Sequence, residues 1–280
     1  MNISQTYALL IGIPLALGCS HSNPLACEGH PEDPRCATDG PIARCATDDE
    51  CAPDVCDVGG TNTCVQCTPN KTAACPGTSP VCGDDLACRG CAAHTECPVS
   101  NACLPDGSCA AESDVAYVSP SGGGTTCTKA TPCGTLKAGL LTNQPYVKFA
   151  SGIVKDSGVT TIDGGTVTIL ADPGAKLDRD GDGAILEIRS AGADVTILDL
   201  EITGQTGIAD AAISIVPNGG SPKVTLTRVK VATNQGGGIS SSGGTLTVSQ
   251  STLSANQGGG ISSSGGTLTV SQSTLSANQG

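Results

Sequence analysis

The stretch that decides the fold runs from Asn234 to Ala255 and reads NQGGGISSSGGTLTVSQSTLSA. Residues 256–277 repeat it without a single change, and Asn278-Gln279-Gly280 begins a third copy. Each 22-residue copy contains three short β-prone pieces joined by turns rich in Gly and Asn. This plan predicts one coil of a parallel β-helix per copy. A helical solenoid is disfavoured because the copies consist largely of Gly, Ser and Thr and lack helix formers.

The apolar residues of a copy indicate which side of each strand faces the interior. In the first copy they are Ile239, Leu246, Val248 and Leu253. Leu246 and Val248 are two positions apart, so they share one face of a strand, which we assign to the core. The alternating residues of that strand should then face solvent: Thr245, Thr247 and Ser249.

Successive coils of a β-helix lie about 4.8 Å apart and place each residue over its equivalent. Asn234, Asn256 and Asn278 should therefore stack into a ladder of side-chain amides at one turn. A simpler interpretation, compatible with the ladder, is that these asparagines are turn residues.

Upstream of the repeat, short alternating or apolar strands are punctuated by Gly, Asp, Asn and Pro. They are predicted at residues 166–170, 184–188, 195–202, 212–216 and 224–229. Residues 135–141 should form a short amphipathic helix that covers the open end of the coil, with Leu136 and Leu140 facing inward.

Two segments carry a family resemblance. Ala116-Tyr-Val-Ser-Pro-Ser-Gly122 precedes Thr131-Pro-Cys-Gly-Thr-Leu-Lys-Ala138. Together they resemble the entry segment of right-handed parallel β-helix proteins of the pectin-lyase-like superfamily. The resemblance implies that a Tyr-Val-Ser strand and a Pro-x-x-Thr-Leu helix start the coil at about residue 114. Cys133 stands where that family usually has an aromatic residue, and a Cys127–Cys133 cross-link can take over its packing role.

The chain contains 17 cysteines, most of them in a segment without helical or strand periodicity. Such a segment buries too little apolar surface to offset its chain entropy, so disulfides should hold it together. The cysteines expected to pair are Cys27, Cys36, Cys45, Cys51, Cys56, Cys64, Cys67, Cys75, Cys82, Cys88, Cys91, Cys97, Cys103, Cys109, Cys127 and Cys133. Residues 45–51 and 91–97 resemble each other, which indicates two related small modules. The two Cys-x-x-Cys pairs, with His94 nearby, leave a zinc site as the alternative.

The N-terminus indicates export. An apolar run at residues 8–17, too short to span a membrane, ends in Ala16-Leu17-Gly18-Cys19. This resembles the lipobox of bacterial lipoproteins, which implies a signal peptide at 1–18, a lipid on Cys19 and anchoring at the outer membrane or cell surface. Sixteen cysteines then remain, an even number. Ordinary secretory cleavage, giving a secreted protein, is the alternative.

The predicted organisation after the signal peptide has three parts. Residues 19–34 form a lipid-anchored tether, 35–112 a Cys-rich disulfide-stapled region, and 114–280 the β-helix. Because the chain stops three residues into a repeat, we expect it to be part of a longer protein.

One motif has the residue types of a metal site. Asp178-Arg-Asp-Gly-Asp-Gly-Ala-Ile185 matches the first positions of a calcium loop, with carboxylates at positions 1, 3 and 5. Asp178, Asp180 and Asp182 would be ligands, and Glu187 could partly replace the missing glutamate at position 12. The alternative is an acidic turn exposed to solvent.

No residue set predicts catalysis. The acids Asp199, Glu201 and Asp210 and the bases Arg228 and Lys230 are best interpreted as a solvated charged face. All three histidines precede the coil, so no histidine-based site is expected on it. The net charge of −12 lacks the basic patch of a nucleic-acid binder.

The function favoured by these features is that of a non-catalytic surface lipoprotein, structural or adhesive. It would contact the membrane through its anchor, and extracellular polysaccharide or another surface protein through its coil. Two alternatives remain: a polysaccharide-degrading lyase or hydrolase whose active-site coils are missing or degenerate, and a purely structural envelope protein.

Overall fold

The computed structural model describes residues 44–280 except 72–74 and 191. Their internal contacts divide them into two compact units. One holds the described residues up to 71 together with Cys82–Ala87, and the other holds Cys75–Val81 and Cys88–Gly280. In the described part of the chain, no helix has the length and apolar character needed to cross a membrane.

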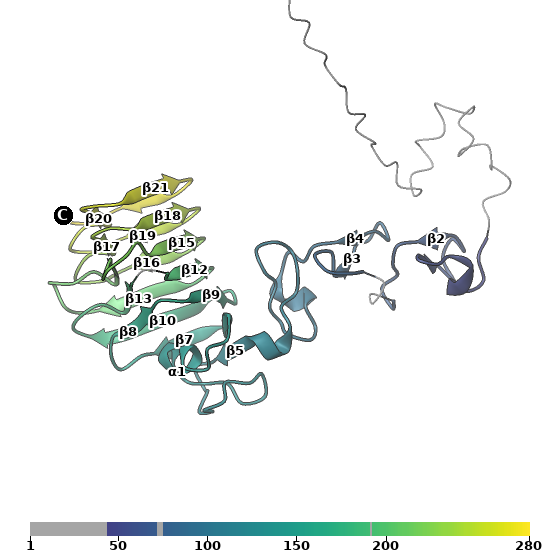
Figure 1. Ribbon diagram of the computed structural model, residues 1–280, viewed down its shortest axis with the longest axis horizontal. Coiled ribbons are helices and arrows are strands. Elements are labelled where there is room, and N and C mark those ends of the chain that lie inside the picture. Colours follow the sequence, from purple (N-terminus) through teal and green to yellow (C-terminus); the bar gives the residue numbers. More distant parts are fainter. Residues whose placement is uncertain (1–43, 72–74, 191) are drawn as a thin grey trace, which may run out of the picture. The chain divides into compact units, whose positions relative to one another are not determined.

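The larger unit contains a parallel β-helix in which each coil adds one strand to each of three sheets (Figure 1). The sheet with seven strands, here called the long sheet, consists of β5 (Val115–Val118), β6 (Tyr146–Phe149), β9 (Thr166–Ala171), β12 (Asp194–Leu198), β15 (Lys223–Thr227), β18 (Thr245–Ser249) and β21 (Thr267–Ser271). The second sheet has β7 (Gly152–Lys155), β10 (Ala175–Gly181), β13 (Glu201–Gln205), β16 (Lys230–Ala232), β19 (Thr252–Ser254) and β22 (Thr274–Ser276). The third has β8 (Thr160–Asp163), β11 (Leu186–Arg189), β14 (Ile213–Val216), β17 (Ile239–Ser241) and β20 (Ile261–Ser263). The predicted all-β fold with three short strands per coil is confirmed.

Strand pairing keeps equivalent residues in register from coil to coil. Leu246 of β18 pairs with Val224 of β15 on one side and with Leu268 of β21 on the other. Leu246 and Val248 are buried, whereas Thr245 is exposed. The predicted inward and outward faces of this strand are therefore confirmed.

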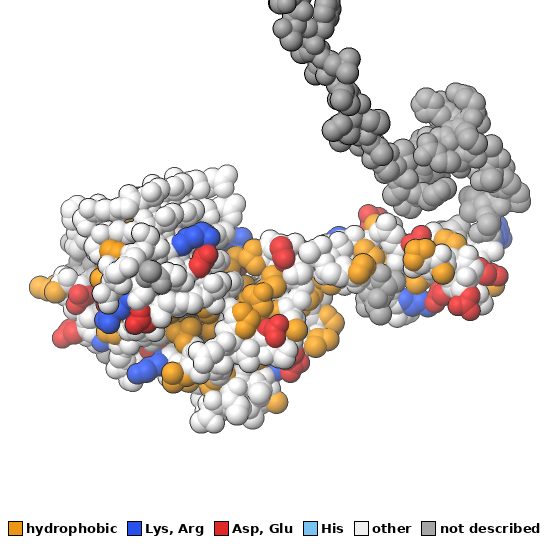
Figure 2. Space-filling model, viewed as in Figure 1, with side chains coloured by type: hydrophobic (Ala, Val, Ile, Leu, Met, Phe, Trp, Pro, Cys, Tyr) orange, Lys and Arg blue, Asp and Glu red, His pale blue; other side chains and the backbone are white. Residues whose placement is uncertain are grey.

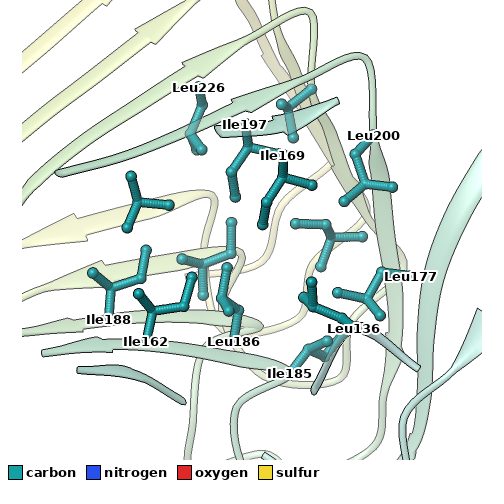
Figure 3. Close-up of a cluster of buried hydrophobic side chains, with 14 of the residues drawn as sticks. Leu136, Ile162, Ile169, Leu177, Ile185, Leu186, Ile188, Ile197, Leu200 and Leu226 are labelled. Carbon is teal, nitrogen blue, oxygen red and sulfur yellow. The ribbon is translucent and has the colours of Figure 1, made fainter. Parts of the chain in front are cut away.

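The interior of the coil is filled by stacked aliphatic side chains (Figure 3). Its fully buried members include Leu136, Ile169, Leu177, Ile185, Leu186, Ile188, Ile197, Leu200 and Leu226. Phe149 is the aromatic member of this cluster. Each such side chain contributes about 1.5–3 kcal/mol when fully buried. Many small aliphatic side chains, stacked from coil to coil, therefore take the place of the large aromatic residues in the core of an ordinary domain.

A short helix, α1 (Leu136–Leu140), packs against β5, β6 and β8. Thr135 caps its start, because its side chain accepts a hydrogen bond from the Ala138 amide at 3.2 Å. Leu136 is fully buried and Leu140 packs partly buried against the same core. The helix predicted at 135–141 is thus present, with its apolar residues directed inward.

The predicted asparagine ladder is also present inside the coil. The side-chain amide of Asn234 donates to Asn256 Oδ1 at 2.9 Å, and that of Asn256 donates to Asn278 Oδ1 at 3.0 Å. Asn256 Nδ2 also donates to the Val231 carbonyl at 3.0 Å. Each amide oxygen accepts in addition the backbone N–H of the asparagine one coil earlier. The asparagines therefore bond neighbouring coils to each other.

All described cysteines are paired in disulfides. The pairs are Cys45–Cys56, Cys51–Cys64, Cys67–Cys82, Cys75–Cys88, Cys91–Cys103, Cys97–Cys109 and Cys127–Cys133. Cys19, Cys27 and Cys36 lie outside the described residues. The Cys127–Cys133 link next to the first strand agrees with the packing role expected for it, because both residues are buried.

The first six disulfides form three groups of four cysteines, each joined first to third and second to fourth. We call them Cys module 1 (Cys45–Cys64), Cys module 2 (Cys67–Cys88) and Cys module 3 (Cys91–Cys109). The sequence comparison predicted modules 1 and 3 and missed module 2. Each Cys-x-x-Cys pair joins one module to the next and forms no internal bond.

Cys modules 1 and 3 share their local structure. Module 1 contains the 3-10 helix η2 (Asp48–Glu50), and module 3 contains the corresponding 3-10 helix η4 (His94–Glu96). The other short elements are the paired strands β1 (Val55–Cys56) and β2 (Cys64–Val65) of module 1, the strands β3 (Val81–Cys82) and β4 (Cys88–Arg89) of module 2, and the 3-10 helix η5 (Glu112–Asp114) after module 3. Glu50 and Glu96 each accept two backbone N–H groups at the start of these helices, which explains the resemblance of their sequences.

Candidate functional site

The outer face of the long sheet carries one uninterrupted column of threonines. Its members, one on each of five successive strands, are Thr168, Thr196, Thr225, Thr247 and Thr269. Strand spacing places them about 4.8 Å apart. Threonine is stiff at χ1, so the column presents hydroxyl and methyl groups in a regular row with little conformational freedom to lose on binding. We call it the threonine column.

Charged side chains on the earlier coils neutralise one another across neighbouring strands. Glu201 lies between Lys176 at 3.1 Å and Lys230 at 3.3 Å on the second sheet, and Asp194 pairs with Lys223 at 3.1 Å on the long sheet. Of the acids expected to form a solvated face, Glu201 is therefore engaged in surface ion pairs, and Asp199 pairs with Arg228.

After Lys230 the chain contains no Asp, Glu, Lys or Arg as far as Gly280. In Figure 2, the visible face of the coils that contain β18 and β21 accordingly carries neither acidic nor basic side chains. The exposed groups there are hydroxyls, amides and backbone.

A groove of about 960 Å³ lies between Cys module 3 and the long sheet, within the larger compact unit. The sheet contributes Leu170, Thr196, Leu198, Thr225 and Thr227, and the ends of the strands add Asp172, Asp199 and Arg228. Module 3 contributes the opposite wall, which includes Ala93, His94, Leu104 and Pro105. Two members of the threonine column thus belong to the groove.

Cys module 3 is held firmly on the sheet. A second buried apolar cluster joins Ala102 of the module to Tyr117, Leu170 and Leu198 of the β-helix. The Tyr117 hydroxyl donates to the Ser100 carbonyl at 2.6 Å. The Lys129 ammonium donates to the carbonyls of residues 98 and 99 at 3.1 and 2.6 Å. Because the module is also closed by two disulfides, the groove is preformed.

Two ion pairs lie at the groove. Lys148 on β6 is 2% exposed and donates to Asp172 and to the Phe149 carbonyl. Burial lowers the pKa of Lys148, and the hydrogen bond and charge of Asp172 oppose that change. On the rim, Arg228 Nε and Nη2 donate to the two carboxylate oxygens of Asp199 at 2.6 and 2.8 Å. This contact to Asp199 raises the pKa of Arg228.

His94 is half-buried in the groove, where its Nδ1 accepts the Cys103 backbone N–H at 3.0 Å. Burial lowers the pKa of His94, and the charge of Lys148 adds to this effect. In Cys module 1, Asp48 accepts the Cys56 N–H at 2.9 Å in the same way, so the position has a structural role. His94 precedes the coil in the sequence but lies beside it in the structure, because module 3 packs against the sheet. The expectation that no histidine-based site belongs to the coil stays a prediction.

Among the described side chains of the predicted calcium loop, Asp178, Asp182 and Glu187 do not bring their oxygens together around one point. Asp178 and Asp180 lie on β10, and Asp178 contacts Lys155 at 3.5 Å. Glu187 on β11 is paired with Arg189 at 2.5 Å. The side chain of Asp180 lies outside the described part of the structure. Among the described side chains, no three acids bring their oxygens within 4.8 Å of one another.

The turn after β10 is organised by its own cation. The guanidinium of Arg179, which is 9% exposed, donates to the carbonyls of Asp182 and Ala184. The Ala184 carbonyl, at position 7 of the loop, is the backbone oxygen that a bound calcium ion would otherwise use. The structure therefore gives no support to the calcium site, which stays a prediction.

Comparisons with known proteins assign no family. No family model matches the chain, and neither the curated proteins nor the solved structures contain a match.

Proposed function

We propose that this chain is a non-catalytic, lipid-anchored surface protein whose β-helix adheres to an uncharged, hydroxyl-rich surface such as a neutral polysaccharide. The observation that carries this proposal is the threonine column, whose last two members, Thr247 and Thr269, lie on coils without charged residues. A regular row of stiff hydroxyl and methyl groups can make the same weak contact many times along a repeating ligand. Weak contacts that are linked in this way add up to firm attachment.

Binding is favoured over catalysis by the state of the acids near the groove. Glycoside hydrolysis needs two carboxyl groups that are able to act as acid and as base or nucleophile. Asp172 and Asp199 are each tied to a cation instead. Neither carboxylate is placed to exchange protons with a substrate without breaking its ion pair.

Export and anchoring belong to the same proposal. Seven disulfides among the described cysteines suit an oxidising compartment outside the cytosol. The lipobox resemblance makes Cys19 the lipidated residue and the outer membrane or cell surface the site of attachment. Mass spectrometry of the native protein tests this. An N-terminal peptide that starts elsewhere, or that lacks acyl chains, would rule out the anchor.

Co-sedimentation with insoluble polysaccharides tests adhesion. The chain should pellet with neutral polymers and not with polyuronates, and salt should change the bound fraction little because no charges take part. The double variant Thr247→Lys/Thr269→Lys puts two long, charged side chains into the threonine column and should abolish pelleting.

The matched control is Ser240→Lys/Ser262→Lys, which places the same side chains on the third sheet of the same two coils. It should pellet like the wild type. Equal behaviour of the two double variants would contradict the role of the threonine column. If the wild type pellets with none of the polymers, adhesion is wrong and the purely structural alternative is favoured.

A further inference from the structure

We infer that the groove between Cys module 3 and the long sheet is a specific binding site for a short, neutral oligosaccharide. The inference takes its class of ligand from the proposed function, and it adds a site that the repeat alone does not provide. It also assigns Cys module 3 a direct part in binding, in place of a purely structural one.

The dimensions and the stiffness of the groove are those of a ligand site. Its volume of about 960 Å³ lies within the range of pockets that hold small ligands, roughly 300–1,000 Å³. Both walls are fixed before a ligand arrives, one by hydrogen-bonded strands and the other by the disulfides Cys91–Cys103 and Cys97–Cys109. A preformed site has little conformational entropy to lose on binding.

The lining combines apolar and polar groups. Leu104 and Pro105 of Cys module 3 present accessible apolar surface, whereas Leu170 and Leu198 of the sheet are almost fully buried beneath the module. The sheet side adds the hydroxyls of Thr196, Thr225 and Thr227. A sugar ring has the matching character, with C–H groups on its faces and hydroxyls around its edge. The ring can therefore lie against Leu104 and Pro105 while its edge exchanges hydrogen bonds with the threonines.

The ion pair on the rim suits neighbouring sugar hydroxyls. The Asp199 carboxylate accepts hydrogen bonds, and the Arg228 guanidinium donates them at an adjacent position. A hydroxyl group does both, so two adjacent hydroxyls can bridge the pair without separating it. Asp199 and Arg228 are both partly exposed, which leaves them accessible from the groove.

The charge of the groove excludes ionic ligands. Asp172 is neutralised by Lys148 and Asp199 by Arg228, and a lowered pKa keeps His94 neutral near pH 7. No unbalanced charge remains among these groups to compensate a carboxylate, a phosphate or an ammonium group. A neutral polyhydroxyl ligand loses no strong hydration on entry and fits this balance.

The position of the groove links it to the threonine column. Thr196 and Thr225 belong to both, and the column continues over Thr247 and Thr269 beyond the groove. A long polymer that is held at the groove can thus run on over the uncharged coils.

Isothermal titration with soluble hexasaccharides of neutral sugars, and with an oligogalacturonate at low salt, tests the site. The wild type should bind a neutral hexasaccharide and not the acidic one. Thr225→Val/Thr227→Val keeps the shape of both side chains, removes their hydroxyls and should weaken binding about tenfold. Thr252→Val/Thr274→Val, the same exchange on the second sheet, should leave binding unchanged.

A second variant closes the groove without touching its sheet side. Ala93 is exposed on the wall of Cys module 3, so Ala93→Trp should fold, fill the space and abolish binding. Binding of the acidic sugar alone, or unchanged binding in both groove variants, would overturn the inference. A chain that pellets with neutral polymers but binds no hexasaccharide also overturns it, while leaving the proposed adhesion intact. If the chain binds the hexasaccharide but does not pellet with neutral polymers, the groove is a binding site and the proposed adhesion is wrong.

Discussion

Replacement of Asn256 by Ala should destabilise the coils around it. This side chain is fully buried and takes part in four hydrogen bonds. Its oxygen accepts from Asn234 N and Nδ2 at 3.3 and 2.9 Å, and its nitrogen donates to Val231 O and Asn278 Oδ1 at 3.0 Å each. Each net bond contributes about 1 kcal/mol, and the partners left without one in the interior cost more. We expect a loss of about 3–5 kcal/mol in the free energy of unfolding.

Urea unfolding followed by far-ultraviolet circular dichroism measures this loss, and hydrogen exchange locates it. Because each coil contacts only its neighbours, exchange should quicken first in peptides from 256–280. The substitution also changes the mass of its own copy of the repeat, which separates peptides that are otherwise identical. The control Gln250→Ala removes one exposed bond of 3.3 Å to Gln272 and should cost under about 0.5 kcal/mol. If Asn256→Ala costs less than about 1 kcal/mol, the ladder does not hold the coils together.

Three further changes test the groove and the turn after β10. Asp172→Ala leaves buried Lys148 without its partner and should lower the free energy of unfolding in urea by about 3–5 kcal/mol. Lys148→Met removes the buried charge and should lower it by less than about 1.5 kcal/mol. Equal losses in the two variants would contradict the role of the ion pair. Folding lowers the pKa of His94 from its ordinary value of 6.5, so protonation of His94 favours the unfolded chain. The stability that neutral His94 contributes is present above pH 6.5 and should be lost as the pH falls through the pKa of the folded state. Melting temperatures across this range should fall less in His94→Gln, and identical curves would refute the assignment. Calcium titration by calorimetry should give no saturable heat because Arg179 already holds the carbonyls of its turn, and heat that vanishes in Asp178→Ala would reverse that conclusion.

The features that were predictable from the sequence are those that repeat. An identical copy every 22 residues determines register, so Leu246 inside, Thr247 outside and the ladder through Asn256 all followed from periodicity. The Cys127–Cys133 link was predictable for a different reason, since a resemblance to known coil entries pointed to that loop.

The groove was not predictable because it depends on contacts between distant segments. His94 and Asp199 come together only because Cys module 3 folds back onto the sheet, and nothing in the local pattern of either segment shows this. Lys148 occupies an outward position on β6, which normally means exposure, yet it is covered and paired. The pairing within each module was open as well, because four cysteines allow three arrangements.

The uncharged composition of the last coils has a consequence for survival outside the cell. Trypsin-like proteases cut only after Lys or Arg, and neither residue occurs from Val231 to Gly280. Such enzymes find no cleavage site there even when a coil opens, so resistance does not depend on how stably the repeat is folded. Among the Cys modules, only module 2 contains a residue after which these enzymes cut, Lys71, and it must rely on its cross-links instead. The part of the chain proposed to meet foreign material is thus the part that this class of digestive enzymes cannot cut.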